Sequence, residues 1–261
     1  MRQSKVRLFA GATLRAGSTD IHVPAFGELP PHSPALDGLK NVDGIIGFEL
    51  FDQASVEIDP RRREVRVLAT DDADSIPRGD LHFELARRVP IVVVDVTFHD
   101  GTVLRAPFIL DLGSNADVQL TRHLSSEHDV ASLVSDGSPS VHSAFASDDR
   151  GVEGHVPALR IGSSIVREPG VFVMDGSPAG FEIPNVAGTI GFGVLRHFAM
   201  RVDYARRRLR LVPIDNAVLH DPCSSVTPSY TDEGARRAPS ARVSTAALSH
   251  SPRSGCGRPT P

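Results

Sequence analysis

The sequence predicts an all-β fold made of two tandem copies of one unit, and three observations lead to this prediction. Residues 43–67 align without a gap to residues 187–211 at an offset of 144, with glycines in register. Polar and apolar residues alternate within each block, as in strands with one buried face. The 261 residues include 22 glycines and 20 prolines, which suit tight turns between short strands.

The two aligned blocks predict the same local elements in the same order. Each block begins with an apolar strand that ends at a glycine, Gly47 in the first and Gly191 in the second. A short helical turn then precedes two alternating strands that a basic turn joins. The helical turns and strands are expected at 48–53, 55–59 and 65–68 in the first block, and at 192–197, 200–203 and 209–212 in the second.

Outside the blocks the pattern predicts further strands, a linker, a loop and a tail. The acidic stretch 71–80 is typical of a linker, and the polar residues 123–151 predict a loop or mobile segment. Residues 214–261 are rich in Ser, Pro and Arg and predict a disordered tail. With a turn at Asp100–Gly101, further strands are expected at 89–98, 103–110, 156–161 and 171–174.

Bulk properties argue against several classes of partner. A net charge of −4 and a pI near 6.2 give no electrostatic reason to expect nucleic acid. No run approaches the roughly 18 apolar residues of a membrane span, and residues 1–10 lack a signal-peptide pattern. Cys223 and Cys256 lie in the tail without metal-ligand spacing, so we expect no metal and no cofactor. Localisation is left open.

One segment, residues 108–114, carries recognisable chemistry. An apolar strand ends at Asp111, and Gly113 and Ser114 follow as a turn. A carboxylate at a strand end, among backbone N–H groups and a hydroxyl, can be held rigidly and partly desolvated. General acid–base catalysis by a carboxyl group needs such a setting. A turn aspartate that merely caps its own loop is the alternative.

These residues resemble the signature of aspartic peptidases. Residues 111–114, Asp-Leu-Gly-Ser, are similar to that family's Asp-Thr-Gly-Ser/Ala motif after an apolar strand. Residues 189–191, Thr-Ile-Gly, are similar to the hydrophobic-hydrophobic-Gly element behind its catalytic loop. Over residues 5–213 the order of parts resembles the bacterial retropepsin-like proteins with two tandem lobes, which share the Asp-Gly-Ile-Ile-Gly turn and the basic hairpin.

The resemblance implies a division of the chain into acid-protease barrel lobes. Residues 1–70 would be the C-terminal half of a first, incomplete lobe, 71–80 a linker, and 81–213 a second lobe, followed by the tail 214–261. A flap that covers the substrate would fall at residues 149–154, with Gly151 and Gly154. The substrate would be a peptide or a protein.

The resemblance also implies roles for the site residues. Asp111 would be one of two aspartates that share a proton and activate a water molecule for peptide hydrolysis. Gly113 would permit the turn, Ser114 would hydrogen-bond the carboxylate, and Ile190 and Gly191 would support the catalytic loop. These expectations describe an aspartic-type endopeptidase that is incomplete in this chain. The alternative is an inactive relative that binds peptides by strand addition.

Two departures from the family pattern motivate that alternative. Leu112 stands where the family has Thr or Ser, so the hydroxyl bond that braces the loops is lost or replaced by packing. The repeat register places the partner of Asp111 about 33 positions before Met1, and the sequence contains no second Asp-Thr-Gly-like turn. A late start, an inactive remnant, or pairing of two chains through Asp111 would each explain this. We expect an in-frame Asp-Thr-Gly upstream of the start codon, and self-association or poor solubility.

Other residue groups have more ordinary explanations. His123, Glu127, His128 and Asp129 lack an established metal-ligand spacing, and a polar loop explains them better. A hydrolase triad would need a nucleophile elbow, which is missing around Ser138, His142 and Asp148. Asp59 and Asp203 are expected to form turns, and a solvated turn best explains the basic runs 61–63 and 206–208. The glycines of 188–193 lack the helix of a nucleotide loop.

Overall fold

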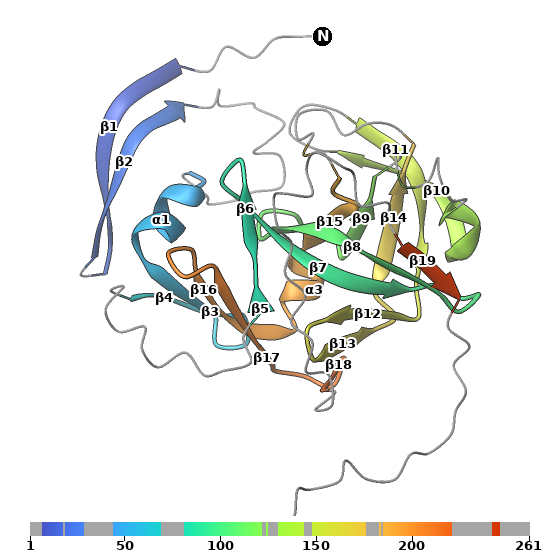
Figure 1. The fold of residues 1–261 in the computed structure, drawn as a ribbon. Coiled ribbons are helices and arrows are strands. Elements are labelled where there is room, and N and C mark those ends of the chain that lie inside the picture. Colours follow the sequence, from blue (N-terminus) through green and yellow to red (C-terminus); the bar gives the residue numbers. More distant parts are fainter. Residues whose placement is uncertain are drawn as a thin grey trace, which may run out of the picture.

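The chain folds into β-sheets, which confirms the predicted all-β class (Figure 1). The computed structural model describes residues 7–17, 19–28, 44–68, 81–121, 124, 130–143, 148–175, 183, 185–220 and 242–245. The described strands form three sheets, and the described helices are short. No helix in the described ranges is long and apolar enough to cross a membrane.

The three sheets differ in size and in the parts of the chain that build them. A two-stranded sheet contains β1 (Arg7–Ala16) and β2 (Thr19–Glu28). A five-stranded sheet has the order β4 (Glu64–Leu68), β3 (Ser55–Asp59), β16 (Phe198–Asp203), β17 (Arg208–Pro213) and β5 (Leu81–His82). This sheet therefore joins the hairpin β3–β4 of the first aligned block to the hairpin β16–β17 of the second.

The third and largest sheet is built from residues after 81. Its main path is β10 (Ser135–Ser143), β11 (Asp148–His155), β14 (Gly170–Met174), β9 (Val118–Leu120), β15 (Gly188–Gly191), β8 (Thr102–Asp111), β7 (Val89–Thr97), β12 (Ala158–Ile161), β13 (Ser164–Arg167) and β18 (Val218–His220). Two further strands pair off this path, β6 (Glu84–Ala86) with β7 and β19 (Arg242–Thr245) with β8. The helical elements described in full are α1 (Phe48–Gln53), α3 (Phe192–Leu195) and a 3-10 turn at Val130–Leu133.

The two aligned blocks share a helix and a hairpin but differ before the helix. β15 is a strand as expected, whereas residues 44–47 form no strand, so the strand predicted to end at Gly47 is wrong. β15 is a strand because β8 and β9 pair with it, and residues 44–47 have no such neighbours among the described residues. Each has a short helix, α1 or α3, followed by a hairpin, β3–β4 or β16–β17. Asp59 accepts the backbone N–H of Arg62 at 3.0 Å, and Asp203 accepts that of Arg206 at 2.9 Å. This confirms the expected turn-forming role of both aspartates.

The structure extends the repeat to a second pair of hairpins. Residues 14–18 read Leu-Arg-Ala-Gly-Ser and residues 159–163 read Leu-Arg-Ile-Gly-Ser. Leu14 pairs with Ile21 in β1–β2, just as Leu159 pairs with Val166 in β12–β13. Both turns use a glycine at positive φ, 63° at Gly17 and 58° at Gly162, which glycine adopts without steric cost. We call residues 14–26 and 44–68 the first copy, and residues 159–171 and 188–212 the second copy. Two residues at the same position in the two copies are called twins, so that residue 14 is the twin of 159 and residue 44 is the twin of 188.

The two copies meet in the five-stranded sheet through their own twin strands. β3 and β16 pair antiparallel, with Glu57 directly opposite Arg201. These two residues are twins, because the offset of the repeat is 144. An antiparallel pair centred on twin residues relates the hairpins β3–β4 and β16–β17 by a local two-fold axis. Duplication of the sequence therefore appears as approximate two-fold symmetry around this strand pair.

The main hydrophobic core lies under the strands of residues 81–220. Phe108, Leu159, Ile190 and Phe198 are fully buried in it, and Phe48 and Phe51 of α1 pack against its edge. Strands from different parts of the chain thus share one packed interior. The predicted strands 89–98 and 103–110 are confirmed as β7 and β8, and the Asp100 carboxylate accepts the N–H of Thr102 in the turn between them.

The predicted loop at 123–151 is wrong for much of its length. Residues 130–133 form the 3-10 turn, and β10 and β11 form a hairpin that β14 continues into the sheet. Val130 and Val134 are buried and anchor its start. Few other side chains of this hairpin are apolar, so backbone hydrogen bonds hold it in the sheet and the sequence shows little alternation.

Two strands lie in the segment for which we expect a disordered tail. Residues 214–220 continue the fold, and β18 pairs with β13 and buries Val218. β19 pairs with Thr102–Arg105 of β8. The sequence pattern misses both because each strand has only three or four residues. The rest of the tail, both cysteines and the expected linker 71–80 lie outside the described residues.

Candidate functional site

Asp111 is the last residue of β8, at the point where the strand leaves the large sheet. β7 pairs with β8 on one side, and β15 pairs parallel with its last four residues on the other. In that register Gly191 lies opposite Asp111. Ile190, one residue earlier, is fully buried. The carboxylate is thus attached to a strand that has neighbours on both sides, while its own residue is exposed.

The turn after Asp111 closes on the carboxylate. The backbone N–H of Gly113 donates to Asp111 Oδ1 at 2.8 Å, and that of Ser114 donates to the Asp111 carbonyl at 3.3 Å. We expect a Ser114 hydrogen bond to the carboxylate, but the Ser114 hydroxyl instead accepts the N–H of Ala116 at 3.3 Å. Gly113 therefore orients Asp111, and Asp111 Oδ2 has no partner among the described residues.

The strand order brings this loop against the end of β15. β8 and β9 follow each other in sequence, yet β15 lies between them in the sheet and pairs with both (Figure 1). Residues 112–117 must therefore cross the end of β15. Three backbone N–H groups at this end donate to carbonyls of the loop: Gly191 to Asp117 at 2.9 Å, Phe192 to Ser114 at 2.6 Å, and Gly193 to Ala116 at 3.1 Å.

Glycine is required where the loop and β15 approach each other. A Cβ atom at Gly191 would lie 2.2 Å from the Ala116 carbonyl oxygen, and one at Gly193 would lie 1.9 Å from Asp117 Oδ1. Both distances are far below van der Waals contact. The glycine of the Thr-Ile-Gly element thus has a direct steric role, because it lets the acid-bearing loop pack on the strand end.

Two more residues of the loop contribute to its packing. Leu112 is half-buried and packs against the hydrophobic core, so packing stands where the family has a hydroxyl. Asp117 was not among the residues that the sequence indicated. Its Oδ2 accepts the N–H of Gly170 at 2.8 Å and fixes the loop to the start of β14. Its partner Gly170 is distant in the sequence, so no local pattern indicated this role.

The residues proposed for a flap lie in the body of a hairpin. Gly151 and Gly154 belong to β11, which pairs with β10 on one side and β14 on the other. A Cβ atom at Gly151 would lie 2.1 Å from the Val173 carbonyl oxygen, and one at Gly154 would lie 2.4 Å from that of Ser135. These glycines permit close strand packing, and residues 144–147 lie outside the described residues.

The remaining candidates do not assemble into a site. The ring of His142 stacks on Phe172 at 4.0 Å, and its Nε2 lies 3.4 Å from Glu153 Oε2, so it has partners other than Ser138. Hydrogen bonds from Ser140 and then His142 lower the pKa of Glu153 below its ordinary value. His123, Glu127, His128 and Asp129 lie outside the described residues. Within the described part of the chain, no cluster of His, Cys, Asp and Glu could hold a metal.

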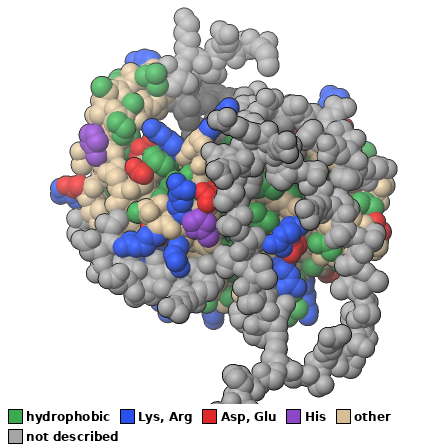
Figure 2. All heavy atoms as spheres, in the orientation of Figure 1, with side chains coloured by type: hydrophobic (Ala, Val, Ile, Leu, Met, Phe, Trp, Pro, Cys, Tyr) green, Lys and Arg blue, Asp and Glu red, His purple; other side chains and the backbone are tan. Residues whose placement is uncertain are grey.

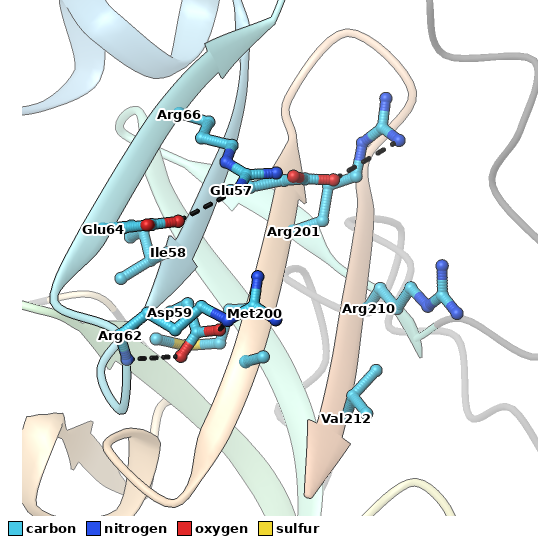
Figure 3. Close-up of a pocket in the computed structure, with 11 residues that line it drawn as sticks. Glu57, Ile58, Asp59, Arg62, Glu64, Arg66, Met200, Arg201, Arg210 and Val212 are labelled. Atoms are coloured by element: carbon cyan, nitrogen blue, oxygen red, sulfur yellow. Dashed lines mark hydrogen bonds and ion pairs between the residues drawn. The ribbon is translucent and has the colours of Figure 1, made fainter. Parts of the chain in front are cut away.

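Two pockets lie against the shared hairpins, and Asp111 lines neither. A pocket of about 200 Å³ faces the five-stranded sheet, where Arg66, Glu57, Arg201 and Arg210 stand directly opposite one another on successive strands (Figure 3). Buried Arg201 donates to Ser55 at 3.0 Å and lies 3.8 Å from Glu57. A larger pocket of about 790 Å³ lies between the β3–β4 turn and α3. The charged side chains of the first pocket are better explained by ion pairs between neighbouring strands than by a catalytic role.

Comparisons with known proteins give a likeness to solved structures and no family. No family model matches this chain, and no curated protein matches it. Among solved structures, it is similar to a retropepsin-like aspartic protease from Rickettsia conorii. That match has a TM-score of 0.30 and 14% identity, and covers 49% of this chain and 100% of the other. At these values the roles of the residues rest on this chain's own geometry.

Proposed function

We propose that this chain is an aspartic-type endopeptidase and that Asp111 supplies one of its two catalytic carboxylates. The observation that carries the proposal is how the loop presents this residue. Asp111 ends a doubly flanked strand, one N–H fixes Oδ1, and three further backbone hydrogen bonds hold the loop to β15 and α3. A carboxylate with one fixed and one available oxygen is positioned to bind and deprotonate water.

The chemistry needs a second carboxyl group close to the first. Two such groups cannot both ionise, so one stays protonated and polarises the peptide carbonyl. The ionised one takes a proton as water attacks the carbonyl carbon. The resulting tetrahedral species breaks its C–N bond when the amine leaves with a proton. In the proposed arrangement residues 81–213 contribute Asp111, the first copy faces the second carboxylate, and an extended peptide or protein is the substrate.

Proteolysis by the purified chain tests this proposal. We would incubate it with an unfolded protein between pH 3 and pH 7, alone and with an added polypeptide of residues 81–120, which contains a second acid turn. We expect cleavage in the presence of that polypeptide, inhibition by pepstatin, and loss of cleavage in the Asp111→Asn chain. Absence of cleavage under every condition, or cleavage that survives Asp111→Asn, would contradict the proposal.

A peptide-binding protein without chemistry is the second candidate. Leu112 favours it, because its side chain packs into the core and cannot brace a second loop through a hydroxyl. Such a protein would bind an extended peptide at an open strand edge. It would bind labelled peptides equally well before and after Asp111→Asn, and it would release them uncleaved.

A further inference from the structure

The two copies differ in how far their apolar side chains are covered by other strands. Three apolar side chains are exposed in the first copy although their twins are buried in the second: Leu14 (45% exposed) against Leu159 (0%), Ile46 (39%) against Ile190 (0%), and Val65 (62%) against Leu209 (1%). The hairpin β1–β2 shows this directly, because hydrophobic side chains lie on its surface at the upper left of Figure 2. Isolated exposed apolar residues are ordinary on protein surfaces, but three exposed residues whose twins are all buried are not.

In the second copy one continuous segment covers all three positions. β7 pairs with β12 and places Val96 opposite Leu159. β8 and β9 enclose β15 and with it Ile190. β5 pairs with β17 and places Leu81 opposite Leu209. All these strands belong to residues 81–120.

The first copy has the matching open edges. Among the described strands, β1 pairs only with β2, and β4 is the end strand of the five-stranded sheet. Residues 44–47, twins of β15, form no strand. The N–H groups of Gly47, Phe48 and Glu49 are twins of those that bind the acid loop, and they have no partner among the described residues. Unpaired edges that carry apolar side chains are ready to accept further strands.

We propose that the first copy is a docking surface for a separate polypeptide segment with the strand order and apolar pattern of residues 81–120. A second copy of this chain is a poor source, because its residues 81–120 already cover its own second repeat copy. In the second copy Gly191 lies opposite Asp111, so a docked segment would place its acid turn beside Gly47. The partner of the proposed peptidase site would therefore arrive with this segment.

One twin position sets the quality of the fit. Gly193 is a glycine because a Cβ there would meet Asp117 Oδ1 at 1.9 Å and the Ala116 carbonyl at 2.9 Å. Its twin is Glu49, which has a Cβ. A docked segment identical to residues 81–120 would clash at this point. The natural partner therefore carries a smaller residue at the place of Asp117, and Glu49→Gly would improve the fit of the chain's own segment.

Binding of a labelled polypeptide of residues 81–120 to the full chain tests the docking surface by fluorescence anisotropy. We expect saturable binding, at least about tenfold weaker binding for Ile46→Asp, and about tenfold tighter binding for Glu49→Gly. Leu219→Asp changes a comparably exposed residue on β18 and should bind like the wild type. Thermal unfolding of each variant checks that it is folded.

Two results would overturn the docking surface. One is absence of saturable binding to both the wild type and Glu49→Gly, or binding that Ile46→Asp leaves unchanged. The other is a stable dimer of the chain alone in light scattering that Ile46→Asp dissociates, because a second copy would then be the occupant. Neither measurement depends on proteolysis, so absence of binding counts against the docking surface, whereas binding without cleavage counts against the peptidase proposal alone.

Discussion

Tyr204 is the residue where both copies and the segment 81–120 meet. Its ring lies 5.8 Å from Phe48, 5.3 Å from Phe51 and 5.3 Å from Phe83, measured between centroids. Burial raises the pKa of Tyr204 to about 12. Since the neutral phenol is favoured in the folded chain, its contribution to stability is complete below the ordinary pKa of about 10 and is lost as the pH rises through 12.

This burial gives an alkaline signature. We expect Tyr204 to ionise near pH 12 when absorbance at 295 nm is followed, above the ordinary tyrosine pKa of about 10. The melting temperature of the wild type should fall more between pH 10 and pH 12 than that of Tyr204→Phe, which keeps the ring packing. Ionisation of Tyr204 near pH 10 in the folded protein, seen as the absorbance change that Tyr204→Phe removes, would contradict this packing.

The Asp215–His197 pair gives a matching acidic signature. His197 Nδ1 lies 2.5 Å from Asp215 Oδ2. Burial acts to raise the pKa of Asp215, but hydrogen bonds from His197 and the Ala217 N–H outweigh it and leave the pKa below 3.8. The pair therefore stabilises the fold above about pH 4, and this contribution is lost as the pH falls through the lowered pKa.

Asp215→Asn should isolate the contribution of the ionised Asp215 to the stability of the fold. At pH 7 we expect the variant to melt below the wild type. Between pH 5 and pH 2 the two melting curves should converge, because protonation removes from the wild type what the substitution has already removed. A difference in melting temperature that stays constant down to pH 2 would show that the pair does not act through this ionisation.

At the scale of the element, β15 and its twin provide a matched experiment. Gly191→Ala would push a methyl group to 2.2 Å from the Ala116 carbonyl, whereas a Cβ at Gly47 meets nothing within 4 Å. Overpacking of this kind typically costs about 1–3 kcal/mol. We expect denaturant unfolding to show that loss for Gly191→Ala and little change for Gly47→Ala. Equal effects at the two positions would contradict the enclosure of β15 by its loop.

The elements that could be predicted from sequence were those with a strong local pattern. The hairpins at 55–68 and 198–213 alternate in polarity and repeat, so both their positions and their turns at Asp59 and Asp203 were expected. The β10–β11 hairpin has too few apolar side chains to show alternation. The role of Asp117 depends on β14, which is distant in sequence, so no local pattern could reveal it.

At the scale of the whole molecule, the sequence indicates the duplication but not how the copies meet. The offset of 144 predicts twin hairpins, and the structure confirms them. The antiparallel pairing of β3 with β16, and the insertion of β15 between β8 and β9, join residues far apart in the chain. Such pairings depend on which strand edges remain open after local folding, and the alternation of polar and apolar residues in the sequence does not indicate which edges these are.

The division of the chain into lobes follows from this arrangement as a proposal. Residues 81–213 would form a lobe that is complete around Asp111, and residues 1–70 would form half of another. The exposed twins Leu14, Ile46 and Val65 support this division, because each lacks the cover that residues 81–120 give in the second copy. A two-carboxylate site would then exist only when the first copy is also covered.

Dependence of peptide hydrolysis on two separate aspartates tests this account most directly. The Glu49→Gly chain, which should fit the polypeptide of residues 81–120 without the clash, would be mixed with that polypeptide, and Asp111→Asn would be introduced into the chain, into the added polypeptide, or into both. We predict that hydrolysis of an unfolded protein at acidic pH requires both carboxylates and falls by at least about a hundredfold when either is replaced. Hydrolysis that persists with both replaced, or that never depends on Asp111 of the chain, would contradict the account.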